Sequence, residues 1–140
     1  DIIICNDWQT SFVPTLLKEQ FVKKDFYSNI KSVYMIHSIN NYRKFSKSAY
    51  NMLDIEPSQS GKLIDNHIQA MEHADLTIAL NYESEKLMDK MKKQKNLLNQ
   101  FESTNHIIID VPKKTNKEVW DNIANIIEVA NLYVTFNANS

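Results

Sequence analysis

Residues 1–10 read DIIICNDWQT, an apolar run that ends abruptly in polar side chains and a tryptophan. The β-branched run over residues 1–5 shows no polar alternation, which predicts a strand covered on both faces, as in a parallel sheet. Ligands of such sheets bind outside the carboxyl ends of the strands. Asn6 and Asp7 therefore fall where a binding site is expected.

Three more stretches have this character, and helical patterns separate them. The predicted strands are residues 1–5, 32–37, 76–80 and 106–111, with residues 132–136 as a candidate fifth strand. The predicted helices are residues 10–24, 62–73, 83–101 and 116–129. This alternation predicts an α/β fold with a Rossmann-like doubly wound parallel sheet of four to five strands. A length of 140 residues without a clear linker predicts a single domain, residues 1–140.

Composition argues against several classes of function. The chain has 43% hydrophobic and 24% charged residues, as globular proteins do, and its net charge of -1 argues against nucleic-acid binding. No apolar stretch approaches the ~18 residues of a membrane span and no targeting segment is visible, so we expect an intracellular protein, cytoplasmic or organellar. The single cysteine, Cys5, cannot form an internal disulfide. The single glycine, Gly61, excludes glycine-rich phosphate loops, and no resident cofactor is expected.

The residues after the first two strands each have two interpretations. Asp7 can fix a sugar hydroxyl or cap the following helix, since aspartate is a favoured N-cap. Trp8 can wall a pocket or belong to the core. His37 and Ser38 end the second strand and would lie beside Asn6 if the two strands are neighbours. The imidazole can donate to a sugar oxygen or a phosphate or act as a general acid, or it is a satisfied histidine at a strand end.

Other reactive residue types favour structural roles. His67 and His73 are six residues apart, and six residues turn a helix by about 600°, so the two side chains face different sides and no metal site is expected. The basic run over residues 89–95 predicts a solvated helix face, and Cys5 an inert core thiol. Residues 39–61 predict a long polar loop, of the kind that is often functional.

Three stretches resemble bacterial glycogen synthases and plant-type starch synthases, retaining glucosyltransferases of GT-B architecture. In that family a strand ends in His-Asp-Trp and a Val-Pro-x-x-Leu-Lys helix follows, and DIIICNDWQTSFVPTLLKE (residues 1–19) is similar to this pattern. SVYMIHS (residues 32–38) resembles the family's Ser-Val-x-x-Ile-His-Asn. MEHADLTIALNYESEKL (residues 71–87) resembles a helix that ends in Ala-Asp before a strand. The resemblance covers about residues 1–90 and leaves residues 91–140 without a counterpart.

This resemblance implies transfer of glucose from ADP-glucose or UDP-glucose to an α-1,4-glucan, in a cleft between two Rossmann-like domains. The chain would be part of the N-terminal domain, with Asn6, Asp7, Trp8, His37 and Ser38 as substrate-binding residues. Two departures stand out. Asn6 occupies the place of the family's histidine, and the glycine-rich phosphate loop and the second domain have no counterpart in these residues. Because an asparagine amide cannot take up a proton at neutral pH, unlike the family's imidazole, we assign no catalytic residue.

Three hypotheses are consistent with these observations. The first is a partial or divergent glucosyltransferase domain that needs a second domain or a larger assembly, and that transfers no glucose as this isolated chain. The second is a non-catalytic relative, a pseudoenzyme, that serves as a binding or structural subunit of a larger assembly. The third is an unrelated flavodoxin-like or response-regulator-like module, which would need an acidic cluster after the first strand or a flavin phosphate loop, and the sequence has neither.

Overall fold

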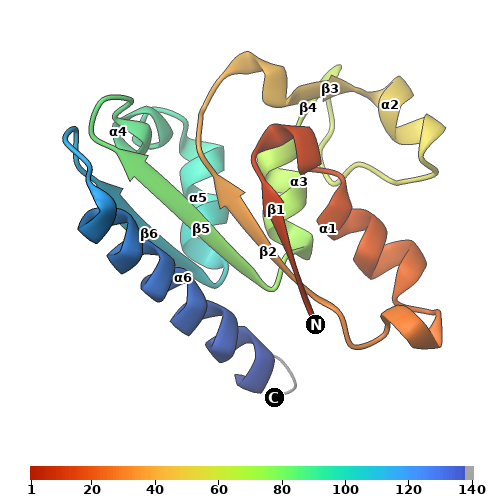
Figure 1. Ribbon diagram of the computed structural model, residues 1–140. Coiled ribbons are helices and arrows are strands. Elements are labelled where there is room, and N and C mark those ends of the chain that lie inside the picture. Colours follow the sequence, from red (N-terminus) through yellow and green to blue (C-terminus); the bar gives the residue numbers. More distant parts are fainter. Residues whose placement is uncertain (138–140) are drawn as a thin grey trace.

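The structure is a computed structural model that describes residues 1–137, and its centre is a four-stranded parallel sheet (Figure 1). The strands are β1 (Ile2–Asn6), β2 (Lys31–Ile36), β5 (Leu76–Tyr82) and β6 (His106–Val111), in the spatial order β1-β2-β5-β6. Each lies within two residues of a predicted strand. The predicted α/β, Rossmann-like fold is therefore confirmed, with four strands in the main sheet.

Helices cover both faces of this sheet. They are α1 (Val13–Leu16), continued by the wider turn η2 (Leu17–Phe21), α2 (Lys47–Met52), α3 (Asn66–His73), α4 (Leu87–Lys92), α5 (Lys95–Ser103) and α6 (Lys117–Asn137). Three short 3-10 turns, η1 (Trp8–Thr10), η3 (Asp25–Tyr27) and η4 (Asn41–Arg43), complete the connections. Figure 1 shows α6 in front of the sheet and α3 and α5 behind it.

The core consists of two apolar clusters, because successive side chains of a strand point to opposite faces. Tyr34 and Ile36 of β2 face the cluster behind the sheet, whereas Val33 of β2 faces α6 in front of it. Cys5 lies in the rear cluster and is 1% exposed, and burial raises the pKa of its thiol to about 11. This environment agrees with the predicted inert core thiol, since the thiolate is the reactive form.

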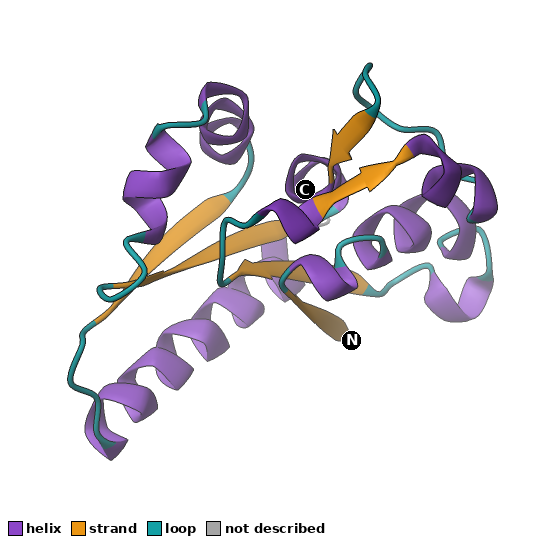
Figure 2. Ribbon diagram, turned by 90° about the horizontal axis from the view of Figure 1, so that it is seen from above, coloured by secondary structure: helices purple, strands orange, loops and turns teal. Residues whose placement is uncertain are grey.

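Residues 39–61 are not the simple loop that was predicted. They contain α2 and a short strand, β3 (Lys44–Ser46), which pairs antiparallel with β4 (Leu63–Asp65) in a ribbon outside the main sheet (Figure 2). The helix predicted from residue 62 consequently begins only at Asn66. The Asp65 side chain fixes that start, because it accepts a 3.0 Å hydrogen bond from the His67 N–H.

The predicted helix over residues 83–101 is broken into α4 and α5. Gln94 separates them with an extended backbone, φ −120° and ψ 90°. Its side-chain oxygen accepts a hydrogen bond from the Arg43 guanidinium. A long-range polar contact at Gln94 thus accompanies a helix end that the apolar pattern did not reveal.

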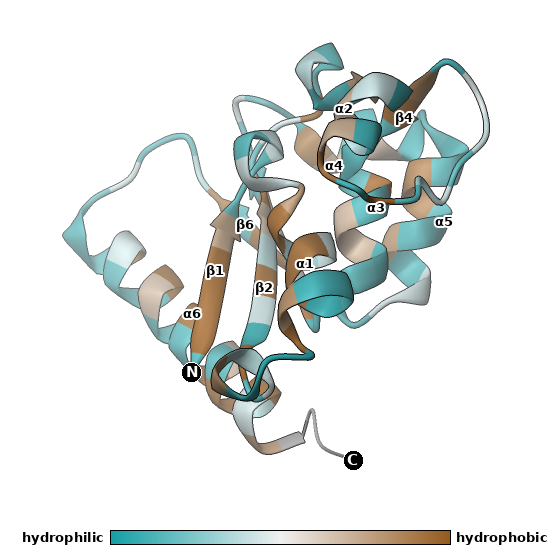
Figure 3. Ribbon diagram, turned by 90° about the vertical axis from the view of Figure 1, so that its right-hand side faces the viewer, coloured by the Kyte–Doolittle hydropathy of each residue, from teal (hydrophilic) through white to brown (hydrophobic). Residues whose placement is uncertain are grey.

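The candidate fifth strand over residues 132–136 is wrong, because these residues form the last turns of α6. Val134 points into the front cluster and is 2% exposed, while Phe136 is 77% exposed. At the other end of the sheet, β1 is an outer strand that is apolar for most of its length (Figure 3). No helix within the described residues 1–137 is long and apolar enough to cross a membrane.

Candidate functional site

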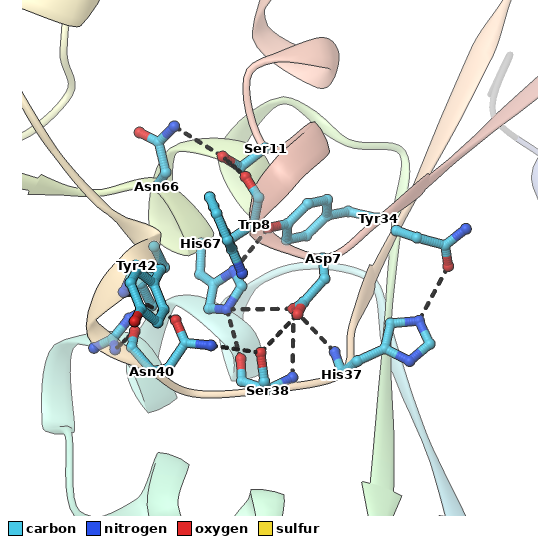
Figure 4. A network of polar contacts seen from close by, with 12 residues as sticks. Asp7, Trp8, Ser11, Tyr34, His37, Ser38, Asn40, Tyr42, Asn66 and His67 are labelled. Carbon is cyan, nitrogen blue, oxygen red and sulfur yellow. Dashed lines mark hydrogen bonds and ion pairs between the residues drawn. The ribbon is translucent and has the colours of Figure 1, made fainter.

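Asp7 fastens the end of β1 to the end of β2. Its carboxylate Oδ1 accepts hydrogen bonds from the N–H groups of His37 (3.2 Å) and Ser38 (3.3 Å), and Oδ2 accepts one from the Ser38 hydroxyl (2.6 Å; Figure 4). The side chain makes no capping bond to η1, so the interpretation of Asp7 as an N-cap is wrong. Most of the acceptor capacity of this carboxylate is used inside the protein.

The backbone of Asp7 is strained. Its φ of 61° and ψ of −169° lie in a region that is almost restricted to glycine and costs about 1–3 kcal/mol for other residues. The Asp7 N–H donates to the Met35 carbonyl at 2.7 Å, which continues the β1–β2 pairing by one residue. The hydrogen bonds to the carboxylate therefore hold a conformation that the chain alone disfavours.

This strain leads to a prediction about substitutions at Asp7. Asp7→Ala and Asp7→Gly both lose the three hydrogen bonds to the carboxylate, but only alanine keeps a Cβ in the strained region. We expect Asp7→Ala to have the lower free energy of unfolding, by about 1 kcal/mol, in urea denaturation followed by circular dichroism. Equal stability of the two variants, or a more stable alanine variant, would contradict the strain.

His37 joins two neighbouring strands at the same edge of the sheet. Its Nε2 lies 3.0 Å from the Asn6 side-chain oxygen, and its Nδ1 lies 3.3 Å from the Tyr82 hydroxyl. Because an amide oxygen only accepts, Nε2 carries the proton and the Tyr82 hydroxyl donates to Nδ1. Burial lowers the pKa of His37 and outweighs the opposing effect of the Asp7 charge, so the ring is neutral at neutral pH. Asn6, His37 and Tyr82 thus form a row of polar groups across β1, β2 and β5.

His67 lies in the protein interior next to Ser38, and the sequence did not indicate its role. Its side chain is fully buried; Nδ1 accepts a hydrogen bond from the Tyr34 hydroxyl (2.7 Å), and Nε2 donates to the Ser38 carbonyl (2.8 Å). Burial lowers the pKa of His67 although Asp65 and Asp7 act in the opposite direction. The ring is therefore neutral, and its 3.8 Å approach to Asp7 Oδ1 is not an ion pair. His67 therefore holds the Ser38 backbone in place through the hydrogen bond to its carbonyl.

His73 takes no part in this network. Its Nδ1 donates to the Gln69 carbonyl at 2.9 Å, and its Nε2 lies 3.2 Å from Glu19. The predicted separation of His67 and His73 is thus confirmed. Among residues 1–137 no group of three or more histidine, cysteine, aspartate or glutamate side chains could hold a metal ion.

Trp8 and Tyr42 form an aromatic surface beside the polar row. The two rings stack with centroids 5.6 Å apart and an interplanar angle of 25°, and Phe45 packs against Trp8 at 6.5 Å. Trp8 is half-buried, whereas Tyr42 is 72% exposed. Trp8 is therefore not a core residue but part of a partly open wall.

The turn that carries Tyr42 is tied to the Asp7 network. Asn40 accepts a hydrogen bond from the Tyr42 N–H (2.9 Å) and donates one to the Ser38 hydroxyl (3.1 Å). Arg43 donates to the Asn40 carbonyl at 2.6 Å. The aromatic wall and the polar row are consequently positioned by one continuous set of hydrogen bonds.

Comparison with known proteins agrees with this arrangement. A family model described as "Starch synthase catalytic domain" matches residues 1–119. The chain belongs to this family. The match extends beyond residue 90, the end of the resemblance seen in the sequence, and includes β6. Most of α6 lies outside it.

The relatives that it resembles are much longer proteins. The glycogen synthase of Clostridium perfringens (strain 13 / Type A) is 44% identical over 66 residues, which cover 45% of this chain and 14% of that enzyme. The glycogen synthase of Lachnospira eligens is 54% identical over 39 residues, 28% of this chain and 8% of that protein. That of Clostridioides difficile (strain 630) is 39% identical over 56 residues, 39% and 12% respectively. The aligned part of the chain thus spans at most about a seventh of each relative.

All five residues expected to bind substrate lie at one edge of this starch synthase-like domain. Asn6, Asp7 and Trp8 come from the end of β1, and His37 and Ser38 from the end of β2. Sequence reasoning missed His67, Tyr42 and Arg43. Their only sequence signals were position: Tyr42 and Arg43 lie in the polar segment after the second strand, and His67 lies on a helix face that reaches Ser38 only in three dimensions.

Proposed function

We propose that this edge of the sheet binds the glucose units of a substrate in a glucosyl transfer reaction. The binding residues are Asn6, His37, Tyr82, Trp8 and Tyr42. In the intact enzyme, glucose would pass from ADP-glucose or UDP-glucose to an α-1,4-glucan. The observation that carries this proposal is the partly exposed stack of Trp8 and Tyr42 beside neutral hydrogen-bonding groups. A glucose ring has apolar C–H faces and a rim of hydroxyls, so it fits an aromatic wall next to a polar row.

Asp7 and Ser38 have a positioning role in this proposal. The Asp7 carboxylate is occupied by internal hydrogen bonds and is only 9% exposed, so it holds the ends of β1 and β2 in place. Asn6 is exposed, and its amide N–H groups donate to no residue among 1–137, which leaves them for a sugar oxygen. His37 offers a neutral ring whose donor already points to Asn6.

The chain alone is expected to bind glucan without transferring glucose. A diphosphate leaving group needs positive partners or a cradle of backbone N–H groups, and the starch synthase-like part here contains no glycine-rich loop for it. A non-catalytic binding subunit is the second candidate function. It is favoured by Asn6, which accepts a hydrogen bond from His37 in the place where the family resemblance expects a histidine.

The test uses tryptophan fluorescence, since the chain has two tryptophans, Trp8 and Trp120. In a Trp120→Phe background, maltohexaose should change the Trp8 emission with a millimolar dissociation constant, about 4 kcal/mol of binding free energy. Tyr42→Ala should weaken this binding by about three- to tenfold, because one stacking partner of the sugar site is lost. The matched control is Phe26→Ala, which removes an aromatic ring that is 81% exposed and lies elsewhere.

Three outcomes separate the hypotheses. Maltohexaose binding without ADP-glucose or UDP-glucose binding supports the retained acceptor surface. Glucan synthesis by the isolated chain contradicts its predicted inactivity. Binding of none of the three ligands contradicts the sugar site and leaves the structural subunit as the function.

A further inference from the structure

The strand β6 is an outer strand of the sheet, and no strand among residues 1–137 pairs with its far side. Together with α6 it forms the left-hand edge of the molecule in Figure 1. Such an edge carries unpaired N–H and C=O groups that can pair with another strand. Its sequence, HIIIDV, is rich in β-branched residues and has no proline that would block such pairing.

Apolar surface is exposed on both faces next to this edge. On the α5 side, Ile108 is 46% exposed. On the α6 side, a groove of about 370 Å³ lies between the start of β6 and α6, with Ile107, Ile126 and Val129 in its lining. Val129 is 65% exposed. A helix that carries apolar side chains outside its core-facing side is usually buried on that second side as well. The β6 part of this surface lies within the family match, whereas Ile126 and Val129 lie beyond its end at residue 119.

We propose that a second copy of this chain pairs with β6 as an antiparallel strand, related by a two-fold axis at Ile108. In that register Ile108 lies opposite the partner's Ile108, and His106 lies opposite the partner's Asp110. The symmetry repeats the second pair, so that both ends of the strand join a histidine to a carboxylate. In its protonated form the imidazole donates Nε2–H to that carboxylate while Nδ1–H stays on the Thr104 carbonyl. Side chains of opposite charge directly across two strands stabilise a sheet, whereas like charges at these positions destabilise it. The edge is thus complementary to itself.

The side chains of this pair are held in place before any partner arrives. The His106 ring packs on Phe101 with centroids 4.5 Å apart, and its Nδ1 donates to the Thr104 carbonyl at 2.7 Å. Asp110 accepts a hydrogen bond from Asn81 at 2.8 Å. Little side-chain entropy is therefore lost on pairing.

A two-fold axis perpendicular to the sheet also keeps both α6 helices on the same face. Because the strands are antiparallel, the groove at the start of β6 then lies beside the end of the partner's β6, in an interface that uses the same patch twice. The other outer strand lacks this property. Antiparallel pairing of β1 with its copy, centred on Ile4, would place Ile2 opposite the partner's Asn6.

The first test is the mass of the chain in solution. Sedimentation analysis should show a mass that rises with concentration from 16.3 kDa towards twice that value. Ile108→Asp should raise the dimer dissociation constant by at least about tenfold, since two carboxylates then face each other at the axis. Ile4→Asp is the matched control: Ile4 is the middle residue of the outer strand β1, is 41% exposed, and should leave the dimer unchanged. A chain that stays monomeric, or a dimer that only Ile4→Asp disrupts, overturns the proposal.

The second test is a charge exchange, which stands even where Ile108→Asp fails to fold. His106→Asp places two carboxylates opposite each other at both ends and should weaken the dimer by at least about tenfold. Adding Asp110→His should restore it, because each pair is then reversed rather than removed. Both positions are exposed, and circular dichroism verifies the fold of each variant. Wild-type dimerisation of His106→Asp, or no recovery in the double variant, refutes the register.

Discussion

Replacing Arg43 by alanine is expected to lower the free energy of unfolding by about 3–5 kcal/mol, the largest effect of any single substitution proposed for this chain. The Arg43 side chain is 1% exposed and has three partners. It donates to the Asp65 carboxylate at 3.0 Å, to the Asn40 carbonyl at 2.6 Å, and to the Gln94 side chain. Its loss leaves the mostly buried Asp65 carboxylate without its cation.

The effect is large because Arg43 connects three parts of the fold. Asp65 caps α3, Asn40 holds the turn that carries Tyr42, and Gln94 marks the break between α4 and α5. Small domains are stable by only about 5–15 kcal/mol, so the expected loss is a large share of the total. The Arg43→Ala variant should also lose the ordered aromatic wall before it unfolds globally.

Urea unfolding followed by far-ultraviolet circular dichroism measures this change. Arg43→Lys keeps the charge but not the planar fork, and an intermediate loss is expected. The matched control is Lys44→Ala, which removes an exposed cation at the next position and should change stability by no more than about 0.5 kcal/mol. A loss of less than about 1 kcal/mol for Arg43→Ala would show that its buried hydrogen bonds contribute little.

The sheet was predictable from the sequence because its signal is local. Residues 32–36 and 76–80 are apolar except for one small hydroxyl residue each, and such runs form strands where helices cover both faces. The ribbon of β3 and β4 has no such signal, since three residues per strand carry no period and their pairing joins residues 17 to 21 positions apart. Residues 132–136 misled for the opposite reason: β-branched and aromatic residues suit a strand, but α6 uses them on two sides of a long helix.

The location of the candidate site could be predicted from the sequence, but the hydrogen bonds that hold it together could not. The carboxyl ends of neighbouring parallel strands meet at one edge, so Asn6 and Asp7 had to lie near His37 once β1 and β2 paired. No sequence pattern shows that Asp7 adopts a positive φ or that its carboxylate bonds to the β2 end. That conclusion needs the relative position of two strands and a loop, which tertiary packing determines.

Acidification from about pH 7.5 to about pH 5 is expected to destabilise the fold, with His67 contributing up to about 2 kcal/mol of the loss. Burial lowers the pKa of His67 in the folded protein, whereas an unfolded histidine has a pKa near 6.5. The unfolded chain therefore takes up a proton at a higher pH than the folded one. Stability is fully present above pH 6.5 and is lost as the pH falls below it. His37, whose pKa is also lowered, acts in the same direction.

The measurement compares urea unfolding of the wild type and His67→Gln across this range of pH. Glutamine keeps a donor for the Ser38 carbonyl but cannot take up a proton, so the variant should be less stable than the wild type at pH 7.5 and the difference should shrink towards pH 5. His37→Gln is the comparison, because that ring is only partly buried and should account for a smaller part of the slope. The range ends at about pH 5 so that most aspartates and glutamates stay ionised and do not add their own slope. A wild-type stability that rises on acidification, or a constant difference between wild type and His67→Gln, would mean that His67 is not held neutral by its burial against Tyr34 and Ser38.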